Sequence, residues 1–372
     1  MNISKIETAQ AIALLSIVMA NKIILNLPRS IISSTGSSAW LNVIYIVFLS
    51  FLFVFLVIKL LKKFPKMDIL DISEYLGGKY LKAAVGIIFI VIFALTIGTV
   101  LCGYSETLKS IYFNQSPILY ILLFLIGSAC IANKFGIKAI AKVTTIITPI
   151  VFFSILIVLL TPIKSFVIQR FFPLLGYGFN ETFLAGISNI FALSGLSYIL
   201  LIPSLLKESE SYKKVAIISL CISGFYLILS VCCTLLVFPF VLSPNENLSL
   251  YLLTKVSNYG ELIHGVNTIF ILLWIISVIA YISIGLFFML YITQKISTIK
   301  STILLNYCYS LILLVLSYVW KDYIQLNNFS EHTLKYMILA FVFVFNPFIL
   351  ILANIKKRFT RSQTTIASER NT

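Results

Sequence analysis

The sequence predicts an all-α integral membrane protein with ten transmembrane helices in a five-plus-five inverted repeat. Three observations support this prediction. Hydrophobic residues make up 60% of the 372 residues and charged residues only 11%, which is too few to cover a soluble domain of this size. The apolar residues fall in ten continuous runs, and two of these runs end in similar proline-containing segments.

Each apolar run is long enough to cross about 30 Å of hydrocarbon as a helix. Lipid cannot satisfy free backbone groups, so a spanning run must form its own hydrogen bonds. A β-barrel would instead show alternating segments of about ten residues. The ten predicted spans are 8–33, 40–61, 83–111, 117–133, 140–161, 183–206, 213–241, 262–294, 301–320 and 334–355.

The net charge of +15 comes mainly from lysines and arginines between the spans. With the N-terminus in the cytoplasm, most of these residues fall on the cytoplasmic side, as the positive-inside rule requires. We therefore expect both termini in the cytoplasm and no nucleic-acid partner. The basic segment 356–372 is predicted to be a cytoplasmic tail close to anionic headgroups of the bilayer.

Two similar segments suggest an internal repeat. Residues 24–28 read Ile-Leu-Asn-Leu-Pro, and residues 199–203 read Ile-Leu-Leu-Ile-Pro. Five spans in each half is an odd number, so two halves of one fold must run in opposite directions through the membrane. The prediction is a single domain over 1–372, with repeat 1 at about 8–161 and repeat 2 at about 183–355.

Lys22 lies near the middle of the first span, where an isolated lysine is unfavourable by about 2.5–3.5 kcal/mol on insertion scales. Pro28 lacks a backbone donor and clashes with the carbonyl of Ile24. One interpretation is an unwound segment that lines a ligand site, with Asn21 or Asn26 bonding the freed backbone. The other is a proline kink, with Lys22 extending to an interface.

Other spans carry polar residues that favour the same kind of site. In span 6, Ser194 and Gly195 indicate either a helix break or a small-residue packing patch. Span 3 carries Glu106, the only carboxylate assigned to a span, which we expect to pair with Lys109 rather than Lys22. In span 8, Ser277 and Tyr281 share one helix face, which could line a cavity or form ordinary interhelical hydrogen bonds.

Enzymatic residue patterns are not apparent in the sequence, so we expect a protein that is not an enzyme and needs no cofactor or catalytic metal. Asp68, Asp71 and Glu74 could chelate a cation, although an acidic helix start is favoured. The six cysteines all lie in predicted spans and are expected to be buried thiols. The first span is expected to be a retained helix rather than a signal peptide.

The segment 24–28, followed by Gly36 and Trp40, resembles the start of the spore germination permease family. The segment 72–77 (Ile-Ser-Glu-Tyr-Leu-Gly) and the ten-span layout are also similar to this family. These proteins are the B subunits of GerA-type germinant receptors, within the amino acid–polyamine–organocation superfamily. The resemblance covers nearly the whole chain.

The resemblance implies a LeuT-like fold with helices 1 and 6 broken, and a germinant, often an amino acid, bound between helices 1, 3, 6 and 8. It also implies partnership with an A subunit and a lipoprotein C subunit in the spore inner membrane, where the complex senses a ligand more than it transports one. Family members usually carry glycine in the unwound part of span 1, where this chain has Asn21, Lys22 and Ile23.

The leading hypothesis is thus a germinant-sensing membrane subunit. The alternatives are a secondary amino acid transporter and a membrane assembly subunit without a ligand. The candidate ligand-binding residues are Asn21, Lys22, Ile23, Thr99, Tyr104, Ser194, Gly195, Leu196, Ser277 and Tyr281.

Overall fold

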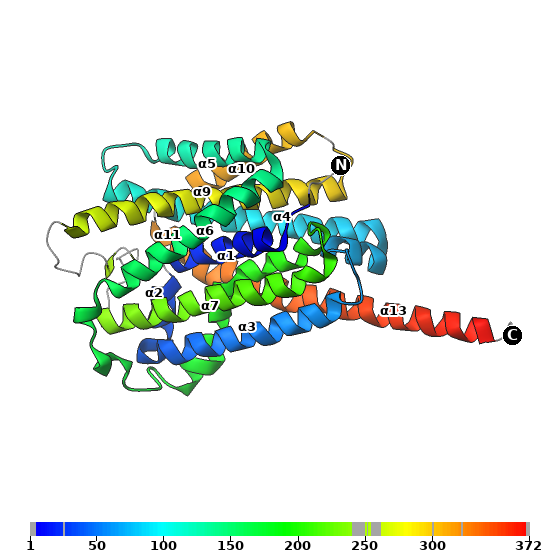
Figure 1. The fold of residues 1–372 in the computed structure, drawn as a ribbon, viewed down its shortest axis with the longest axis horizontal. Coiled ribbons are helices and arrows are strands. Elements are labelled where there is room, and N and C mark those ends of the chain that lie inside the picture. The colour runs from blue at the N-terminus through cyan, green and yellow to red at the C-terminus, as the bar shows by residue number, and fades with distance from the viewer. Residues whose placement is uncertain are drawn as a thin grey trace.

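The computed structural model describes residues 5–24, 27–239, 250, 252–253, 262–299, 301–320 and 323–369. Within these ranges the chain forms a bundle of helices, most of them running along one common direction (Figure 1). Seven helical segments are long and apolar enough to cross a membrane, and three shorter apolar helices accompany them. The all-helical class and the ten predicted spans are confirmed.

The helices divide between two repeats. Repeat 1 contains α1 (Thr8–Ile24), α2 (Leu27–Thr35), α3 (Ala39–Leu61), α4 (Ile69–Ile111), α5 (Ile118–Lys134) and α6 (Gly136–Leu160). Repeat 2 contains η4 (Asn180–Leu184), η5 (Ala185–Leu200), η6 (Ile202–Ser204), α7 (Tyr212–Val237), α9 (Leu262–Ile296), α10 (Thr302–Tyr318), α11 (Tyr323–Phe329), η8 (Ser330–Leu334), α12 (Lys335–Leu339), η9 (Ala340–Phe345) and α13 (Asn346–Glu369). Helices 1 to 5 are α1 with α2, then α3, α4, α5 and α6; helices 6 to 10 are η4 to η6, α7, α9, α10 and the run from α11 to α13.

Reciprocal packing shows the inverted repeat. Where α1 of repeat 1 packs on α7 of repeat 2, the equivalent pair η5 and α3 also packs together. The same exchange relates α1–α6 to η5–α12, and α5–α9 to α10–α4. The pairs α3–α7 and α4–α9 join equivalent helices to each other. Two copies of one helix arrangement therefore enclose a shared core, as in transporters built from inverted repeats.

Helix 6 is interrupted, and helix 1 is described in two parts. These parts are α1 (Thr8–Ile24) and α2 (Leu27–Thr35); residues 25 and 26, and with them the predicted role of Asn26, lie outside the described residues. In helix 6 the break lies at Leu193, whose backbone is non-helical (φ −103°, ψ 21°), directly before Ser194.

The interpretation of residues 21–23 as an unwound segment was wrong. Asn21, Lys22 and Ile23 are helical and belong to α1. The physical reason is that Pro28 disturbs the hydrogen bond to the carbonyl four residues earlier, at Ile24, so the residues before Ile24 keep their helical geometry.

The acidic segment at the start of helix 3 is a helix cap. Asp68 accepts hydrogen bonds from the backbone N–H groups of Leu70 and Asp71, and the Asp71 side chain accepts one from the Asp68 N–H. This reciprocal capping box satisfies donors that the first helical turn leaves free. The helix-start interpretation is confirmed. A bend follows at Gly77 and Gly78, where Gly78 has a positive φ of 72°.

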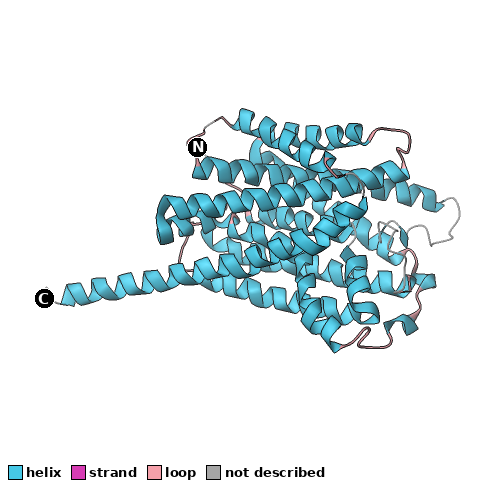
Figure 2. Cartoon of the chain, turned by 180° about the vertical axis from the view of Figure 1, so that it is seen from behind, coloured by secondary structure: helices cyan, strands magenta, loops and turns pink. Residues whose placement is uncertain are grey.

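The C-terminal helix α13 projects beyond the bundle at the end where α1 begins (Figures 1 and 2). Near the bundle, the Lys356 ammonium donates to the carbonyls of Tyr75 and Leu76, just before the bend in α4. The predicted tail 356–372 is therefore a continuation of the last helix as far as Glu369, and its position near headgroups stays a prediction.

The expectation that all six cysteines are buried was wrong for two of them. Cys102, Cys130 and Cys233 are buried and Cys232 is half-buried, whereas Cys221 and Cys308 are exposed. A membrane helix is apolar on its lipid-facing side as well as its inner side, so hydropathy does not distinguish the two faces.

Candidate functional site

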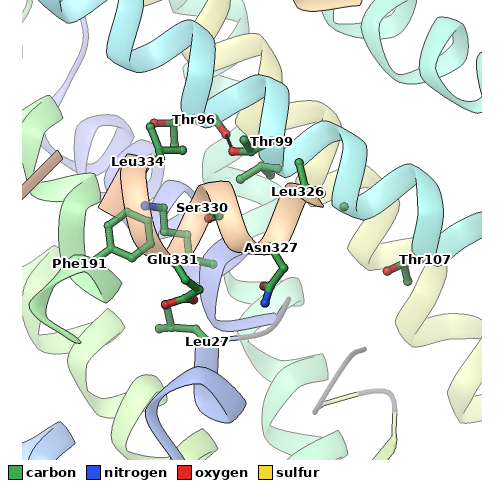
Figure 3. Close-up of a pocket in the computed structure, with 13 residues that line it drawn as sticks. Leu27, Thr96, Thr99, Thr107, Phe191, Leu326, Asn327, Ser330, Glu331 and Leu334 are labelled. Atoms are coloured by element: carbon green, nitrogen blue, oxygen red, sulfur yellow. Dashed lines mark hydrogen bonds between the residues drawn. The ribbon is translucent and has the colours of Figure 1, made fainter. Parts of the chain in front are cut away.

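A cavity of about 100 Å³ lies between the two repeats. Its lining comes from helix 1, helix 3, helix 6 and helix 10, and Figure 3 shows side chains of α4, η5, α11 and η8 gathered around it. The lining residues are Lys22, Leu27, Thr96, Thr99, Val100, Gly103, Thr107, Phe191, Leu326, Asn327, Ser330, Glu331 and Leu334. We call this the central cavity.

Lys22 is the buried cation of the central cavity, with only 8% of its surface exposed. Its ammonium donates a hydrogen bond to the Ser194 hydroxyl, beside the break in helix 6. It also lies 4.1 Å from the centre of the Phe191 ring, where a cation is attracted by the ring face. These contacts hold the charge away from an interface, which supports the cavity-lining interpretation of Lys22.

Glu331 is the carboxylate of the same cavity. It accepts a hydrogen bond of 2.8 Å from the Ser30 hydroxyl of α2, and Lys335 lies 3.5 Å away on the next turn of its own helix. Lys335 is buried and donates to the Asn189 side chain at 3.2 Å. Two buried lysines therefore accompany one carboxylate in this region.

Asn189 continues this polar network into repeat 1. Its amide donates to the Ser34 hydroxyl at 3.1 Å and to the Asn42 side chain at 2.9 Å. Asn42 in turn donates to the carbonyls of Thr182 and Gly186. Buried polar groups need hydrogen-bond partners. These hydrogen bonds connect α2 and α3 to helices 6 and 10 on one side of the central cavity.

A smaller cavity of about 20 Å³ adjoins the first one, since Lys22 and Thr96 line both. The predicted residues Ser194, Gly195 and Tyr281 line this smaller cavity. The structure thus gathers five of the ten predicted site residues, including Thr99, around two neighbouring cavities.

The other five lie in packed regions. Asn21 is fully buried and bonds to Tyr104 and Ser277, which joins helix 1 to helices 3 and 8. Ile23 and Leu196 are part of the hydrophobic core. Because Asn21 and Lys22 are adjacent on a helix, their side chains diverge by about 100°, so only one of them faces the cavity.

Helix 10 contributes residues that the sequence analysis missed. The predicted span began at residue 334, which placed Glu331 in a loop and left Glu106 as the supposed intramembrane carboxylate. In the structure, helix 10 begins at Tyr323 and Glu331 lines the central cavity. The Glu331–Lys335 spacing of i and i+4 was a usable signal, because such pairs share one helix face.

A second charged cluster lies where α4 begins and α9 ends. Lys295 bridges Asp68 and Asp71, with Nζ–Oδ2 distances of 2.6 Å to each. Ser204 donates to Asp68 at 2.9 Å, and the Tyr291 hydroxyl donates to the same carboxylate. We call these five residues the end cluster. It joins the first repeat to helices 6 and 8 of the second.

The central cavity suits a small anion or a carboxylate. The buried Lys22 ammonium supplies the donor, and charge-assisted hydrogen bonds are the stronger kind. The Thr96 and Thr99 hydroxyls donate to carbonyls of their own helix and present oxygen atoms to the cavity. Within the described ranges, no group of three or more His, Cys, Asp and Glu side chains is arranged to hold a metal ion.

Comparison with solved structures places the fold among transporters. A Na⁺-coupled sialic acid symporter in a substrate-bound outward-open state is similar with a TM-score of 0.62 and 10% identity, over 91% of this chain and 79% of the other. The manganese transporter of Eremococcus coleocola is similar with a TM-score of 0.54 and 16% identity, over 95% and 79% of the two chains. These similarities show the fold alone.

Sequence comparison identifies the family. Spore germination protein YndE of Bacillus subtilis (strain 168) is 25% identical over 229 residues, which is 60% of this chain and 62% of that protein. The family model described as Spore germination protein matches residues 5–323. The chain therefore belongs to the spore germination protein family, the permease family whose opening segment its own sequence resembles.

Proposed function

We propose that this chain is the germinant-sensing membrane subunit of a spore germination receptor, and that it binds a small carboxylate such as an amino acid in the central cavity. The family gives the role in germination, and the fold is that of transporters. The observation that carries the proposal is Lys22, a buried cation beside a cavity at the junction of the two repeats.

Charge balance favours a ligand with a carboxylate. Lys22 and Lys335 are both buried, and Glu331 is the carboxylate bonded to Lys335. A ligand carboxylate near Lys22 would give this buried ammonium its own negative partner, while Glu331 pairs with Lys335. The cavity of about 100 Å³ restricts the ligand to a few heavy atoms, since an apolar cavity of about 150 Å³ holds benzene.

The ligand would bias the packing of helix 1 against helix 6. Lys22 lies in α1, and its partner Ser194 directly follows the break in helix 6. A carboxylate that competes for the Lys22 ammonium would change this contact between the two helices. A ligand shifts a conformational equilibrium only through such differential contacts.

The proposed setting follows the family. We propose that the chain works in the spore inner membrane with an A subunit and a lipoprotein C subunit, and that both termini are cytoplasmic. Lysines and arginines are concentrated in the segments before α1 and after α3, α5 and α9. By the positive-inside rule, this distribution supports the proposed orientation.

Germination of spores that carry only this receptor tests the proposal. Lys22→Met preserves an unbranched apolar side chain while removing the charge, and it should abolish or strongly slow the response to germinant at normal protein abundance. Lys62→Met, at an exposed lysine outside the cavity, is the matched control and should respond normally. A normal response in the Lys22→Met spores would refute the proposal.

A secondary amino acid transporter is the second candidate, favoured by the similarity to solved transporters. Uptake of labelled amino acids into proteoliposomes separates the two functions. Robust concentrative uptake would show that the chain is a transporter and would contradict the sensor proposal.

A third possibility is a membrane assembly subunit without a ligand. In that case, substitutions at Lys22, Thr99 and Glu331 should leave germination unchanged.

A further inference from the structure

Three buried hydroxyl groups border the smaller of the two neighbouring cavities, which we call the small cavity. Its lining comes from helices 1, 3, 6, 8 and 10, which contribute for example Val18, Thr96, Ser197, Tyr281 and Val342. The volume of about 20 Å³ is enough for one water-sized group, which needs about 10–15 Å³. The small cavity can therefore hold part of a ligand but not a whole one.

Ser197, Tyr198 and Tyr281 supply the three hydroxyl groups. Their exposed fractions are only 5%, 5% and 1%, and all three residues line the small cavity. Within the part of the chain that the structure describes, none of these hydroxyls forms a hydrogen bond. Most buried hydroxyls in proteins have a partner, because a buried polar group without one is unfavourable. The three free hydroxyls thus indicate an occupant that bonds to them.

The other hydroxyl residues of the lining already have partners. Thr96 donates to the Ile92 carbonyl at 2.7 Å, and Ser194 accepts a hydrogen bond from the Lys22 ammonium. Because Lys22 itself lines the small cavity, a second positive charge there would be repelled. We therefore expect a neutral hydroxyl group in the small cavity rather than an ammonium group.

The Tyr198 hydroxyl has a fixed direction because its ring packs against two other rings. It stacks on Phe93 with the centroids 4.6 Å apart, and the centroid of Phe288 lies 5.0 Å away in an edge-on contact. The Tyr198 oxygen lies 3.6 Å from the position that a Cβ would take at Gly285 of helix 8, one turn after Tyr281. The hydroxyl is therefore held against helix 8 and cannot turn to a different partner.

The small cavity can be reached from the central cavity. Lys22 and Thr96 line both, so a carboxylate bonded to Lys22 would lie at the boundary between them. A hydroxyl on the first or second carbon after this carboxylate can enter the small cavity while the rest of the ligand stays in the central cavity.

We propose that the germinant is a hydroxylated carboxylate, and that its hydroxyl enters the small cavity and bonds to Tyr281, Tyr198 and Ser197. This inference rests on the proposed function, because Lys22 must hold the carboxylate for the hydroxyl to reach this position. A ligand without the hydroxyl leaves the buried groups unpaired, and a site of this kind discriminates strongly against such a ligand. A water molecule has the same chemistry as the ligand hydroxyl, but it gives no preference between the two kinds of ligand.

Calorimetric titration of the purified full chain with two pairs of ligands tests this preference. L-serine and L-alanine differ by a hydroxyl on the β carbon, and lactate and propionate differ by a hydroxyl on the α carbon. In at least one pair the hydroxylated ligand should bind at least about tenfold more tightly, which equals about 1.4 kcal/mol. Tyr281→Phe should reduce this ratio to near unity and leave the affinity for the ligand without the hydroxyl unchanged.

Two further variants accompany Tyr281→Phe. Ser197→Ala removes a second free hydroxyl and should also lower the ratio. The matched control is Tyr212→Phe, which removes a hydroxyl that bonds to the Ile58 carbonyl at the start of α7 and should keep the ratio.

Equal affinities within both pairs, or a preference that persists in both Tyr281→Phe and Ser197→Ala, would overturn the inference. If the carboxylates bind without a hydroxyl preference and Lys22→Met weakens them, the proposed function stands and a water molecule is the occupant of the small cavity. If none of the four ligands binds, the proposed carboxylate site is contradicted, and this inference with it.

Discussion

Removing Asp68 should destabilise the fold by more than the loss of a helix cap. Asp68 is completely buried, caps α4, accepts hydrogen bonds from Ser204 and Tyr291, and pairs with Lys295 at 2.6 Å. Asp68→Ala removes all of these interactions together. Asp68→Asn keeps the capping oxygen, but an amide NH2 group replaces the Oδ2 atom that accepts from Ser204, Tyr291 and Lys295.

The magnitudes follow from the contacts. Loss of an N-cap is worth about 1 kcal/mol, and each neutral hydrogen bond about 1 kcal/mol. Breaking a buried ion pair is worth about 3–5 kcal/mol, but Asp71 still pairs with Lys295, and the Lys295 side chain is 20% exposed. We expect about 3–4 kcal/mol for Asp68→Ala. Asp68→Asn should destabilise the fold by about 1 kcal/mol less than Asp68→Ala, because it keeps the helix cap while losing the contacts of Oδ2.

Thermal unfolding in detergent, followed with a thiol-reactive fluorophore, measures these differences. The dye reports unfolding because Cys102, Cys130 and Cys233 are buried, and serine at the exposed Cys221 and Cys308 removes the background. At somewhat under 2–4 °C per kcal/mol for a chain of this size, Asp68→Ala should lower Tm by about 5 °C.

Ser301→Ala is the control for capping alone. The Ser301 hydroxyl accepts a bond from the Leu304 N–H at the start of α10, so its loss should lower Tm by only about 1–2 °C. A Tm for Asp68→Ala equal to that of Ser301→Ala would show that the end cluster adds no stability. An equal fall in Tm for Asp68→Asn and Asp68→Ala would show that the capping oxygen of Asp68 adds no stability.

Three further predictions concern backbone space and one exposed ion pair. Gly176 has a φ of 52°, and a Cβ there would lie 2.1 Å from the Thr35 carbonyl oxygen, so Gly176→Ala should lower Tm by several degrees; an unchanged Tm would contradict this packing. Gly195→Ala should weaken ligand binding more than it lowers Tm, because the added methyl displaces a flexible Met side chain beside the Lys22–Ser194 contact; unchanged affinity would count against this geometry. The hydrogen bond and charge of Lys207 lower the pKa of Glu7. The pair therefore stabilises the N-terminal segment at pH values above about 4.3, the ordinary pKa of glutamate, and this stabilisation is lost as the pH falls through the lowered pKa. The protection factor of backbone amides near residue 6, which removes the pH dependence of intrinsic exchange, should therefore fall on acidification in the wild-type chain. In Glu7→Gln this protection factor should already be low at neutral pH.

The spans could be predicted because they depend on local chemistry. Long apolar runs must be helical in lipid, whatever they pack against. The reciprocal packing of the repeats agrees with the odd number of spans in each half. These features require no knowledge of which residues meet across the bundle.

The composition of the cavity depends on facing directions, which hydropathy does not contain. Glu331 and Lys335 lower the local hydropathy, so a helix that is polar on its inner side was read as a loop at that point. Asn21 and Lys22 are neighbours of similar polarity, yet one bonds to Tyr104 and the other faces the cavity. Only tertiary packing distinguishes them.

Equilibrium binding of radiolabelled amino acids to the purified chain tests most directly whether Lys22 holds a ligand carboxylate. At least one amino acid should bind the wild-type chain, and its amide, which lacks the carboxylate charge, should bind more weakly. Lys22→Met should weaken binding of that amino acid by about 10–150-fold, the value of a hydrogen bond to a charged group, and should abolish the preference over the amide. Equal affinity in the wild-type chain and a correctly folded Lys22→Met variant would contradict the account.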